Sequence, residues 1–555
     1  MSAMNFEWMR VAKNLLLEKE IKIHKGRVSK NLQRIGIVSV ATVLSRVLGL
    51  LRDVLTFAVF GVSAYAAAFL FAFTLPNLFR RLLGEGSLVA ALVPTLTEEL
   101  EENGRGGAFG LLSQVFSWLL VVTTLLALVC IGLFALIPLI GGLEDRWYLS
   151  SRLAIFLFPY LIFVCLAAAL AAALNVLHRF AIPALTAVWL NLAMIAALGG
   201  GGFLFAESYE KQVLLLCLGV LVGGFLQLVI PFLALVKEGW RPRFEWKMTP
   251  RVKEVGMLMV PGLAGTAIFQ VNVIVSRSLA FGVDESGVAI LYLANRLMEF
   301  PLGIFTIAVA TVIFPVLSRH AVRGDSENYA ATYRQGLRMI LLITVPAAAG
   351  ISLLSEPILE LLFEYGAFGA TATALTVPVL ALFSWSLPLY SIATFATRGF
   401  HSLKNTSTPV RIAGASFLIN LGCSLALMKP FGIFGLALAN LIAVFFQSAI
   451  LQVRLIVAAE PLELRRIWSD FFKIAFATGA MALLLWISLP WTDDWFGGGK
   501  IGEAVRLLVL IPGGAAIYFG LVWFLRVEGR QEVERIVTRW IGRNREKSVK
   551  ASADR

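Results

Sequence analysis

The sequence predicts an all-α polytopic membrane protein with about fourteen transmembrane helices: two parallel-related six-helix lobes and two C-terminal helices. Three observations predict this class. Of 555 residues, 58% are hydrophobic and 15% are charged, and the mean hydropathy is +0.81, which no soluble fold requires. The apolar runs can span a bilayer as helices, and the strand-length alternation of an outer-membrane barrel is absent. Short motifs also recur between the two halves of the chain.

The individual spans follow from a window of about 20 residues. They are 34–60, 64–90, 111–140, 149–175, 181–206, 212–236, 254–282, 287–317, 335–354, 370–397, 408–428, 432–455, 468–490 and 503–526. The boundaries between consecutive spans are least clearly marked near residues 84–98 and 355–370.

The charges of the loops agree with an even number of helices. If residues 1–33 are cytoplasmic, basic residues fall in the inner loops at 237–253, 318–334 and 398–411 and in the tail after Arg526, and acidic residues fall in the outer loops at 283–286, 355–369 and 491–500. The positive-inside rule requires this alternation when both termini are cytoplasmic. The net charge of +13 therefore reflects membrane topology, and a nucleic-acid partner is not expected.

Repeated motifs predict that the chain is duplicated. Phe60-Gly61-Val62 recurs as Phe281-Gly282-Val283, an offset of 221, and Pro94 matches Pro315 at the same offset. Further matches join Pro159 and Tyr160 to Pro388 and Tyr390, Asn191 to Asn420 and Gln227 to Gln447. Because six is an even number, both lobes begin on the same side of the membrane, so the repeat is parallel. A cavity is expected between the lobes near the midplane of the membrane.

The predicted organisation has six parts. They are a basic cytoplasmic extension 1–33, an N-lobe 34–236, a basic cytoplasmic linker 237–253, a C-lobe 254–455, a C-terminal helix pair 456–526 and a basic cytoplasmic tail 527–555.

Arginines within apolar sequence are the candidate functional residues. Arg46 and Arg52 lie in the first expected span, and a charge at bilayer depth usually faces a polar cavity or a partner. Six residues correspond to about 600° of helix, so the two side chains diverge by about 120° and line a broad cavity rather than one narrow face. A cavity lined by guanidinium groups suits a phosphate. Asp53 lies on another face and is expected to pair with a neighbouring helix.

A second group lies at the end of the next span. Arg80 and Arg81 are adjacent, and one of them can anchor lipid phosphates while the other points inward; Arg80 is the preferred inward residue. Glu85, four residues after Arg81, can pair with it.

A third group lies in the second half of the chain. Arg296 and Glu299 are three residues apart and can pair on one helix face. A buried structural ion pair is the alternative, but a phosphate held between two lobes needs donors from both. For Arg277 the sequence leaves open whether it lines the cavity or lies near the outer surface.

Signatures of enzymes and of bound metals are missing from the sequence. There is no Walker A loop, and the four histidines have no metal-ligand spacing. No cofactor is expected. The interiors of the expected seventh, eleventh and twelfth helices contain no carboxylate, although neutral oxygens of Asn420, Ser424 or the backbone could bind a cation weakly.

These motifs together resemble a known family. They are Ser45-Arg46-Val47-Leu48-Gly49 with Arg52-Asp53, Leu75-Pro76-Asn77-Leu78-Phe79-Arg80-Arg81 with Gly84-Glu85-Gly86, Val93-Pro94, and Asn295-Arg296-Leu297-Met298-Glu299-Phe300-Pro301. The chain closely resembles the MurJ (MviN) family of lipid II flippases, part of the multidrug/oligosaccharidyl-lipid/polysaccharide exporter superfamily. The resemblance extends from about residue 30 to residue 526.

The resemblance implies a fold, a substrate and a set of functional residues. It implies two lobes around a cationic cavity and a C-terminal helix pair that forms a groove for the lipid tail. Alternating access would move lipid II, the undecaprenyl-pyrophosphate-linked disaccharide-pentapeptide, across the bacterial inner membrane for cell-wall synthesis. The substrate-binding residues would be Arg46, Arg52, Arg80 and Arg296, with supporting ion pairs from Asp53, Arg81, Glu85 and Glu299.

Two departures from the family pattern remove negative charge. Ala67 and Asn295 stand where some members carry acidic residues, which puts coupling through those carboxylates in doubt. Energy from the membrane potential, or from a monovalent cation, is expected instead of ATP.

The expected ligands are lipid II and membrane lipids, and the chain is expected to be a monomer. Whether cell-wall synthesis enzymes are protein partners is left open.

Other functions compete with this interpretation. A flippase for another polyprenyl-pyrophosphate-linked oligosaccharide is the main alternative, because its substrate carries the same pyrophosphate. An exporter of cationic drugs should have an acidic cavity, and an enzyme acting on polyprenyl phosphates should have a metal-binding acidic loop. A scaffold without transport gives no reason for buried arginines in both lobes.

Overall fold

The computed structural model describes residues 36–204, 208–459, 462–496 and 499–528. These residues are almost entirely helical and contain no strand, which confirms the all-α class. Ten of their helical stretches are long and apolar enough to cross a membrane, whereas the count of fourteen stays a prediction. The extension at 1–33 and all but two residues of the tail at 527–555 lie outside the described residues.

The helices are as follows. Residues 36–60 form the first, followed by α2 (Ala64–Phe79), α3 (Leu88–Ala135), α4 (Asp145–Leu157), α5 (Pro159–Val176), α6 (Ala181–Ala184), α7 (Thr186–Leu204) and α8 (Tyr209–Lys237). Then come α9 (Pro250–Val283), α10 (Gly287–Pro301), α11 (Ile307–Arg323), α12 (Ser326–Leu353), α13 (Ser355–Phe363), α14 (Ala370–Ser384), α15 (Ser386–Ser402), α16 (Ser407–Ala458), α17 (Trp468–Phe496) and α18 (Lys500–Phe524). Short 3-10 turns lie at Ile137–Leu139 and Leu464–Ile467.

The helix ends differ from the expected spans in two ways. Polar residues extend several helices: α12 begins at Ser326, where the Asp325 side chain caps the helix by accepting a hydrogen bond from the Asn328 amide. The expected outer loop 355–369 contains α13, whose Leu359 and Phe363 are buried. An amphipathic helix of this length is too short to be detected with a span-length window.

Turns within long helical stretches occur at glycine. Gly104 in α3 and Gly432 in α16 adopt positive φ values of 66° and 57°, which glycine adopts without steric cost. Gly432 separates the expected spans 408–428 and 432–455, so the join predicted there is present as a turn.

Residues matched between the two halves occupy similar positions. Pro159 and Pro388 each follow a helix break, at Phe158 and Trp385 respectively; proline lacks the amide that would continue the helix. A π-helical segment, Arg80–Ser87, follows α2, and a second, Leu302–Thr306, follows α10, close to the 221-residue offset. These similarities agree with a duplicated chain, although the predicted lobe boundaries stay a prediction.

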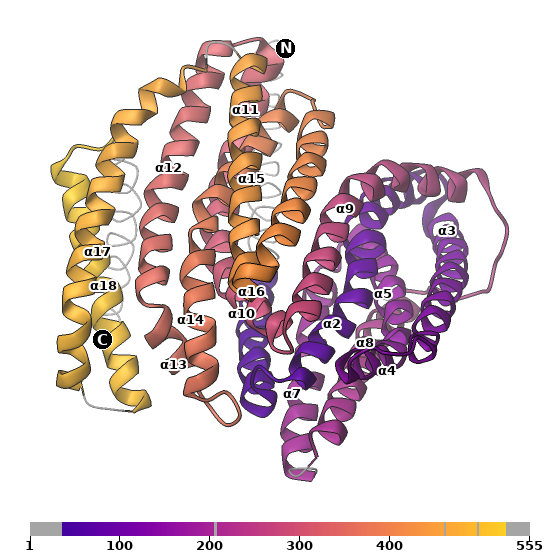
Figure 1. The fold of residues 1–555 in the computed structure, drawn as a ribbon. Helices are drawn as coiled ribbons and strands as arrows, with labels where there is room; N and C mark the ends of the chain where they lie inside the picture. Colours follow the sequence, from indigo (N-terminus) through magenta and orange to yellow (C-terminus); the bar gives the residue numbers. More distant parts are fainter. Residues whose placement is uncertain (1–35, 205–207, 460–461, 497–498, 529–555) are drawn as a thin grey trace, which may run out of the picture. The chain divides into compact units, whose positions relative to one another are not determined.

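The structure divides into two compact units. The first contains residues up to Thr56 together with Ala72–Thr266, and the second contains Phe57–Phe71 together with the chain from Ala267 onward. In the first unit, α5 packs against α3 and α8, and α8 packs against α7 (Figure 1). Its core includes Leu92, Leu112, Leu170 and Trp240.

The core of the second unit is built around α12. This helix packs against α11, α15 and α17, and α17 packs against α18 (Figure 1). The Tyr518 hydroxyl of α18 donates to the Leu342 carbonyl of α12 at 2.8 Å. The C-terminal helix pair therefore shares the core of this unit.

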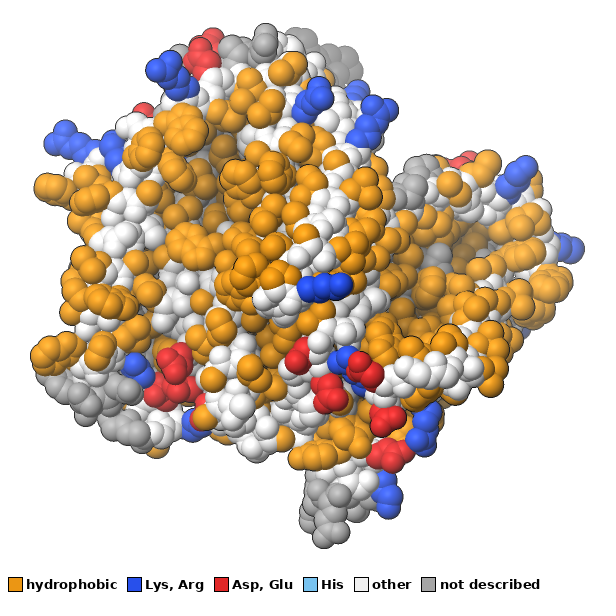
Figure 2. All heavy atoms as spheres, in the orientation of Figure 1, with side chains coloured by type: hydrophobic (Ala, Val, Ile, Leu, Met, Phe, Trp, Pro, Cys, Tyr) orange, Lys and Arg blue, Asp and Glu red, His pale blue; other side chains and the backbone are white. Residues whose placement is uncertain are grey.

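Hydrophobic side chains cover most of the face seen in Figure 2. Large apolar side chains are exposed in both units, for example Leu128 and Leu133 of α3 and Trp486 of α17. Exposed apolar surface of this extent marks contact with lipid, as expected for a multi-pass membrane protein.

Candidate functional site

Arg52, in the helix 36–60, is held by two polar side chains of the first unit. Its Nε and Nη2 donate to Oδ1 of Asp53 at 3.1 and 2.6 Å, and its Nη1 donates to Oδ1 of Asn191 in α7 at 3.1 Å. The Asn191 amide also donates to the Ser45 carbonyl at 3.1 Å. The Asp53 side chain is only 4% exposed. A carboxylate and an amide therefore fix the direction of the Arg52 guanidinium.

Arg46 lies on the same helix in a different environment. Its side chain is exposed, and among the described residues it has no hydrogen-bond or ion-pair partner. The Arg52 side chain is only 14% exposed. This contrast agrees with the predicted divergence of about 120°.

Arg80 begins the π-helical segment Arg80–Ser87, which packs against α5. Its Nε donates to Oδ1 of Asn77 at 3.0 Å. The Ser87 hydroxyl donates to the Leu82 carbonyl at 2.6 Å, five residues earlier, and so satisfies an acceptor within the widened turn. Such π-helical turns are often found at functional sites.

Tyr160 of α5 is a buried polar residue in the core of the first unit. Its side chain is fully buried, and its hydroxyl donates to Oε1 of Gln227 in α8 at 3.3 Å. The sequence matched Tyr160 to Tyr390 of the second half but did not select it as functional.

Arg81 and Glu85 are the other two residues predicted for this region, as members of a supporting ion pair. Arg81 is exposed, as expected of an anchor to lipid phosphates. The side chain of Glu85 lies outside the described part of the structure, so its pairing with Arg81 stays a prediction.

Arg296 and Glu299 form an ion pair in α10 of the second unit. The distance from Arg296 Nη1 to Glu299 Oε2 is 3.6 Å, and the Asn295 amide donates to Oε1 of Glu299 at 3.0 Å. The side chains of Arg296 and Glu299 are 32% and 44% exposed. A pair this exposed is weak, so Arg296 can exchange its partner at low cost.

Arg277, also in the second unit, contacts the segment Phe57–Phe71. Its Nη1 donates to the Leu70 carbonyl at 3.4 Å, and its guanidinium lies 5.5 Å from the centroid of the Tyr292 ring. These contacts join α9 and α10 to a segment that precedes them by some two hundred residues.

An amide cluster joins α9 and α16 in the second unit. The Asn420 amide donates to Oδ1 of Asn272 at 2.9 Å and to Oγ of Ser276 at 3.0 Å, whereas its own Oδ1 has no partner among the described residues. Ser424, one turn later, is also buried. For a weakly bound cation the sequence offered the oxygens of Asn420 and Ser424, whereas Asn272 and Ser276 are added by the structure. Within the described ranges, no group of three His, Cys, Asp or Glu is placed to hold a metal ion.

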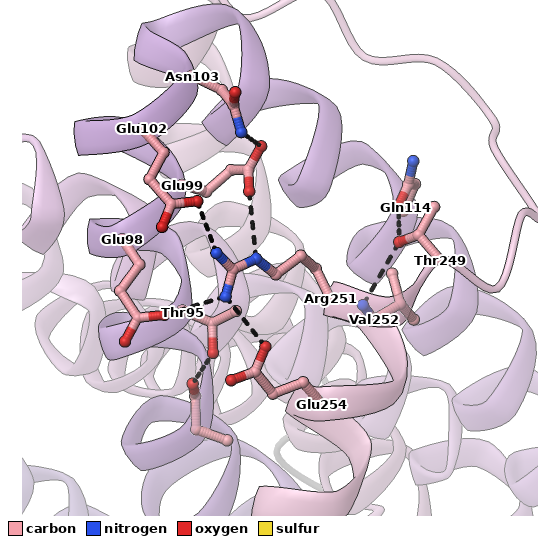
Figure 3. Close-up of polar contacts among 11 residues, drawn as sticks. Thr95, Glu98, Glu99, Glu102, Asn103, Gln114, Thr249, Arg251, Val252 and Glu254 are labelled. Carbon is pink, nitrogen blue, oxygen red and sulfur yellow. Dashed lines mark hydrogen bonds and ion pairs between the residues drawn. The ribbon is translucent and has the colours of Figure 1, made fainter.

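An unexpected cluster surrounds Arg251 at the start of α9 (Figure 3). Its guanidinium contacts Glu98 at 3.0 Å, Glu99 at 3.5 Å and Glu102 at 2.7 Å, all in α3, and Glu254 of α9 at 3.2 Å. Hydrogen bonds to Glu254 and Glu102 raise the pKa of Arg251, so it stays cationic. The sequence placed Arg251 in a basic linker and overlooked the acidic run that faces it.

Replacing Arg251 with glutamine is expected to lower the Tm of the purified protein by a few degrees at low salt. The change leaves like charges at Glu98 and Glu102, four residues apart on α3, where they repel each other. Because exposed charges are screened, high salt should shrink the difference in Tm from the wild type. Arg251→Lys, which keeps the positive charge, is the matched control and should lower the Tm less. A difference that persists unchanged at high salt would contradict this account.

The comparisons with known proteins agree with the motifs in the chain. Residues 57–499 match the family described as Lipid II flippase MurJ. The probable lipid II flippase MurJ of Vibrio cholerae is 32% identical over 517 residues, which cover 90% of this chain and 97% of the relative. That of Haemophilus influenzae is 34% identical over 498 residues, covering 86% and 96%.

Solved structures show the same fold. A lipid II flippase MurJ in an inward closed conformation has a TM-score of 0.72 and 26% identity, covering 88% of this chain and 98% of that structure. An inward-facing multidrug resistance transporter of the MATE family has a TM-score of 0.62 and 14% identity, covering 75% and 95%. The second similarity concerns the fold alone.

Proposed function

Because the chain belongs to the MurJ family of lipid II flippases, we propose that it moves lipid II from the cytoplasmic to the outer leaflet of the bacterial inner membrane. The movement is alternating access by a monomer with both termini in the cytoplasm, and it supplies precursor for cell-wall synthesis. Transport of this kind makes and breaks no covalent bond, so the chain is not expected to be an enzyme.

The exposure of Arg46 is the observation that carries this proposal. Arg46 lies ten residues into the described helix 36–60, is exposed, and has no partner among the described residues. An arginine facing hydrocarbon at this depth would cost several kcal/mol, so such side chains face water or an anionic ligand. A pyrophosphate satisfies the requirement because guanidinium groups bind phosphate oxygens in a bidentate manner.

The other arginines act as oriented donors. Asp53 and Asn191 hold Arg52, and Asn77 holds Arg80, so little conformational entropy is lost when a phosphate binds them. In the second unit, Arg296 exchanges its exposed partner Glu299 for a phosphate oxygen. Neutralising the pyrophosphate lowers the cost of taking its charges away from bulk water.

The polyprenyl tail stays in lipid beside the C-terminal helix pair. Large apolar side chains project from α17 and α18, among them Trp486, Leu508 and Phe524. Their packing on α12 leaves an apolar surface on which a long isoprenoid chain can lie without contacting water.

We infer that the membrane potential supplies the energy. An inside-negative potential favours outward movement of negative charge by about 2.3 kcal/mol per charge per 100 mV, and it draws the emptied cationic residues back. The oxygens of Asn272, Asn420 and Ser276 are the proposed ligands if a monovalent cation contributes. They carry no formal charge, so the cation would be bound weakly.

Native mass spectrometry of the purified protein tests the proposed substrate. Lipid II is competed against an O-antigen-type lipid pyrophosphate and an ordinary anionic phospholipid, with Arg46→Ala and Arg296→Ala measured beside the wild type. Arg152→Ala is the matched control, because Arg152 is exposed and pairs with Glu210. We expect selective retention of lipid II that both site variants lose and the control keeps. Equal retention of every lipid, unchanged by either site variant, would contradict the proposal.

A further inference from the structure

The linker between α8 and α9 is bound to one face of α3, and all three belong to the first unit. It contains no helix from Trp240 to Thr249. The Trp240 indole donates to Oγ of Ser113 at 2.9 Å, and the Glu245 amide donates to Oγ of Ser117 at 3.0 Å. Because Ser113 and Ser117 are one turn apart on α3, the linker follows that helix over at least one turn.

Glu245 and Thr249 hold the linker to Gln114 of α3. Nε2 of Gln114 donates to Oε2 of Glu245 at 3.2 Å, and Oε1 of Gln114 accepts from Oγ1 of Thr249 at 2.8 Å (Figure 3). Oγ1 of Thr249 also accepts from the Val252 amide at 3.4 Å and so caps α9. Glu245 is the only acidic residue of the segment 241–249, so its contact with Gln114 turns the one negative charge of the segment towards α3.

The other long side chains of this segment are exposed. Phe244, Trp246 and Met248 are each more than half exposed, although all three are large and apolar. Three basic residues are interleaved with them and are also exposed: Arg241, Arg243 and Lys247. These three have no ion-pair partner among the described residues. The linker therefore presents a surface that is both apolar and cationic.

Trp118 of α3 determines where this surface lies along the helix. The centroid of its ring is 5.6 Å from that of Trp246, which is in turn 5.6 Å from that of Phe244. Val122 and Leu125 follow Trp118 by four and seven residues, so the three share one face of α3. Val122 and Leu125 are exposed and begin the apolar stripe by which α3 contacts lipid. Trp246 therefore lies within about one helical turn of the start of that stripe.

Ion pairs mark the water side of the same region. Arg251, shortly after the segment 241–249, contacts Glu98 and Glu102 of α3, whose side chains are 55% and 60% exposed. Carboxylates that are this exposed lie in water and not in hydrocarbon. The aromatic side chains of the linker thus lie between a lipid-facing stripe and a hydrated cluster. Aromatic side chains concentrate at this boundary in membrane proteins.

We propose that the linker forms an anchor that binds anionic phospholipid headgroups at the cytoplasmic surface of the membrane, where the proposed topology places it. The linker anchor comprises Arg241, Arg243, Phe244, Trp246, Lys247 and Met248. Its apolar members enter the headgroup region, and its basic members contact lipid phosphates. It contains none of the proposed substrate arginines, so the inference goes beyond the proposed flipping of lipid II.

Charge favours lipid over the N-terminal extension as the occupant of this surface. Residues 1–33 contain seven Lys or Arg and three Glu, so the basic members of the linker anchor would repel the extension. An anionic headgroup region instead attracts basic residues while it accepts aromatic side chains.

Fluorescence quenching in nanodiscs tests where the linker anchor lies. Met248→Cys is introduced into a full-length variant without native cysteines and is labelled with bimane, in nanodiscs of phosphatidylglycerol and phosphatidylcholine. Leu125→Cys, on the apolar stripe, and Glu101→Cys, in the acidic run of α3, are matched controls at exposed positions. Spin-labelled lipid is the quencher within the membrane, and iodide is the quencher in water. The native cysteines to be replaced are Cys130, Cys165, Cys217 and Cys423.

We expect spin-labelled lipid to quench the probes at positions 248 and 125 but not the probe at position 101. Quenching of the probe at 248 by iodide alone would place the linker in water and overturn the anchor. Protection of that probe from both quenchers would show that protein covers the linker, which would also overturn the anchor. No lipid II is present, so these outcomes are independent of flipping.

Neutralising the basic members tests the preference for anionic lipid. Arg241→Gln, Arg243→Gln and Lys247→Gln are combined, and native mass spectrometry at low salt compares the binding of phosphatidylglycerol with that of phosphatidylcholine. Each neutralised residue should lower the preference for phosphatidylglycerol about fivefold. The control variant removes three exposed charges from other expected inner loops: Arg319→Gln, Arg323→Gln and Arg411→Gln. Its preference should fall much less. Equal losses in the two variants would show that the preference follows net charge alone, which would contradict a specific anchor.

Discussion

Replacing Arg52 with alanine is expected to abolish lipid II flipping. The change removes a guanidinium that Asp53 and Asn191 hold in place. Hydrogen bonds to charged groups contribute about 1.5–3 kcal/mol each, and a loss of about 3 kcal/mol weakens phosphate binding about a hundredfold. The measurement is the initial rate of lipid II movement in proteoliposomes, corrected for the amount of folded protein.

Loss of folding must be separated from loss of binding. Arg52→Ala removes the cation that lies 2.6 Å from the buried carboxylate of Asp53, which is itself destabilising. The double variant Arg52→Ala with Asp53→Asn removes that charge and should fold better while still failing to flip. Arg52→Lys keeps the charge but loses the planar fork, so its rate should lie between those of wild type and alanine. Wild-type flipping by the double variant would show that Arg52 is structural.

Replacing Arg338 with alanine is expected to cause the largest loss of stability. Arg338 of α12 contacts Asp470 of α17 through Nε and Glu528 through Nη2, each at 2.6 Å. The side chains of Arg338 and Asp470 are 12% and 6% exposed, and removing one partner of a buried pair costs about 3–5 kcal/mol. Thermal unfolding in detergent should show a clearly lower Tm, and α17 should loosen first.

A double variant provides the control for Arg338. Arg338→Met with Asp470→Leu replaces the pair by apolar side chains, which is often neutral in a buried setting. Its Tm should return towards that of the wild type. If the double variant were as unstable as Arg338→Ala, the loss would come from packing around Arg338 and not from a stranded charge.

Hydropathy predicts the apolar middle of a helix well and its polar ends poorly. The spans and the turn at Gly432 follow from apolar runs and glycine. Hydropathy does not show that Glu98, Glu99 and Glu102 continue the helix, because charged residues terminate an apolar window although they are good helix formers. The capping residue Asp325 was a detectable signal for the early start of α12.

Partners of the arginines depend on tertiary structure. Arginine within apolar sequence is visible directly, which is why Arg46, Arg52, Arg80 and Arg296 could be selected. Asn191 lies 139 residues from Arg52, and no local pattern connects them. The backbone contact between Ala58 and Ala367 is equally hidden, because the two residues lie about three hundred residues apart in the chain.

The most direct test of the central claim is lipid II translocation by the purified protein in vesicles that contain no other protein. It is measured with and without an imposed inside-negative potential, and an O-antigen-type lipid pyrophosphate serves as the comparison substrate. The account predicts movement of lipid II that the potential accelerates, that the comparison substrate does not share, and that Arg46→Ala eliminates. Movement no faster than in protein-free vesicles, or the same rate for wild type and Arg46→Ala, would contradict it.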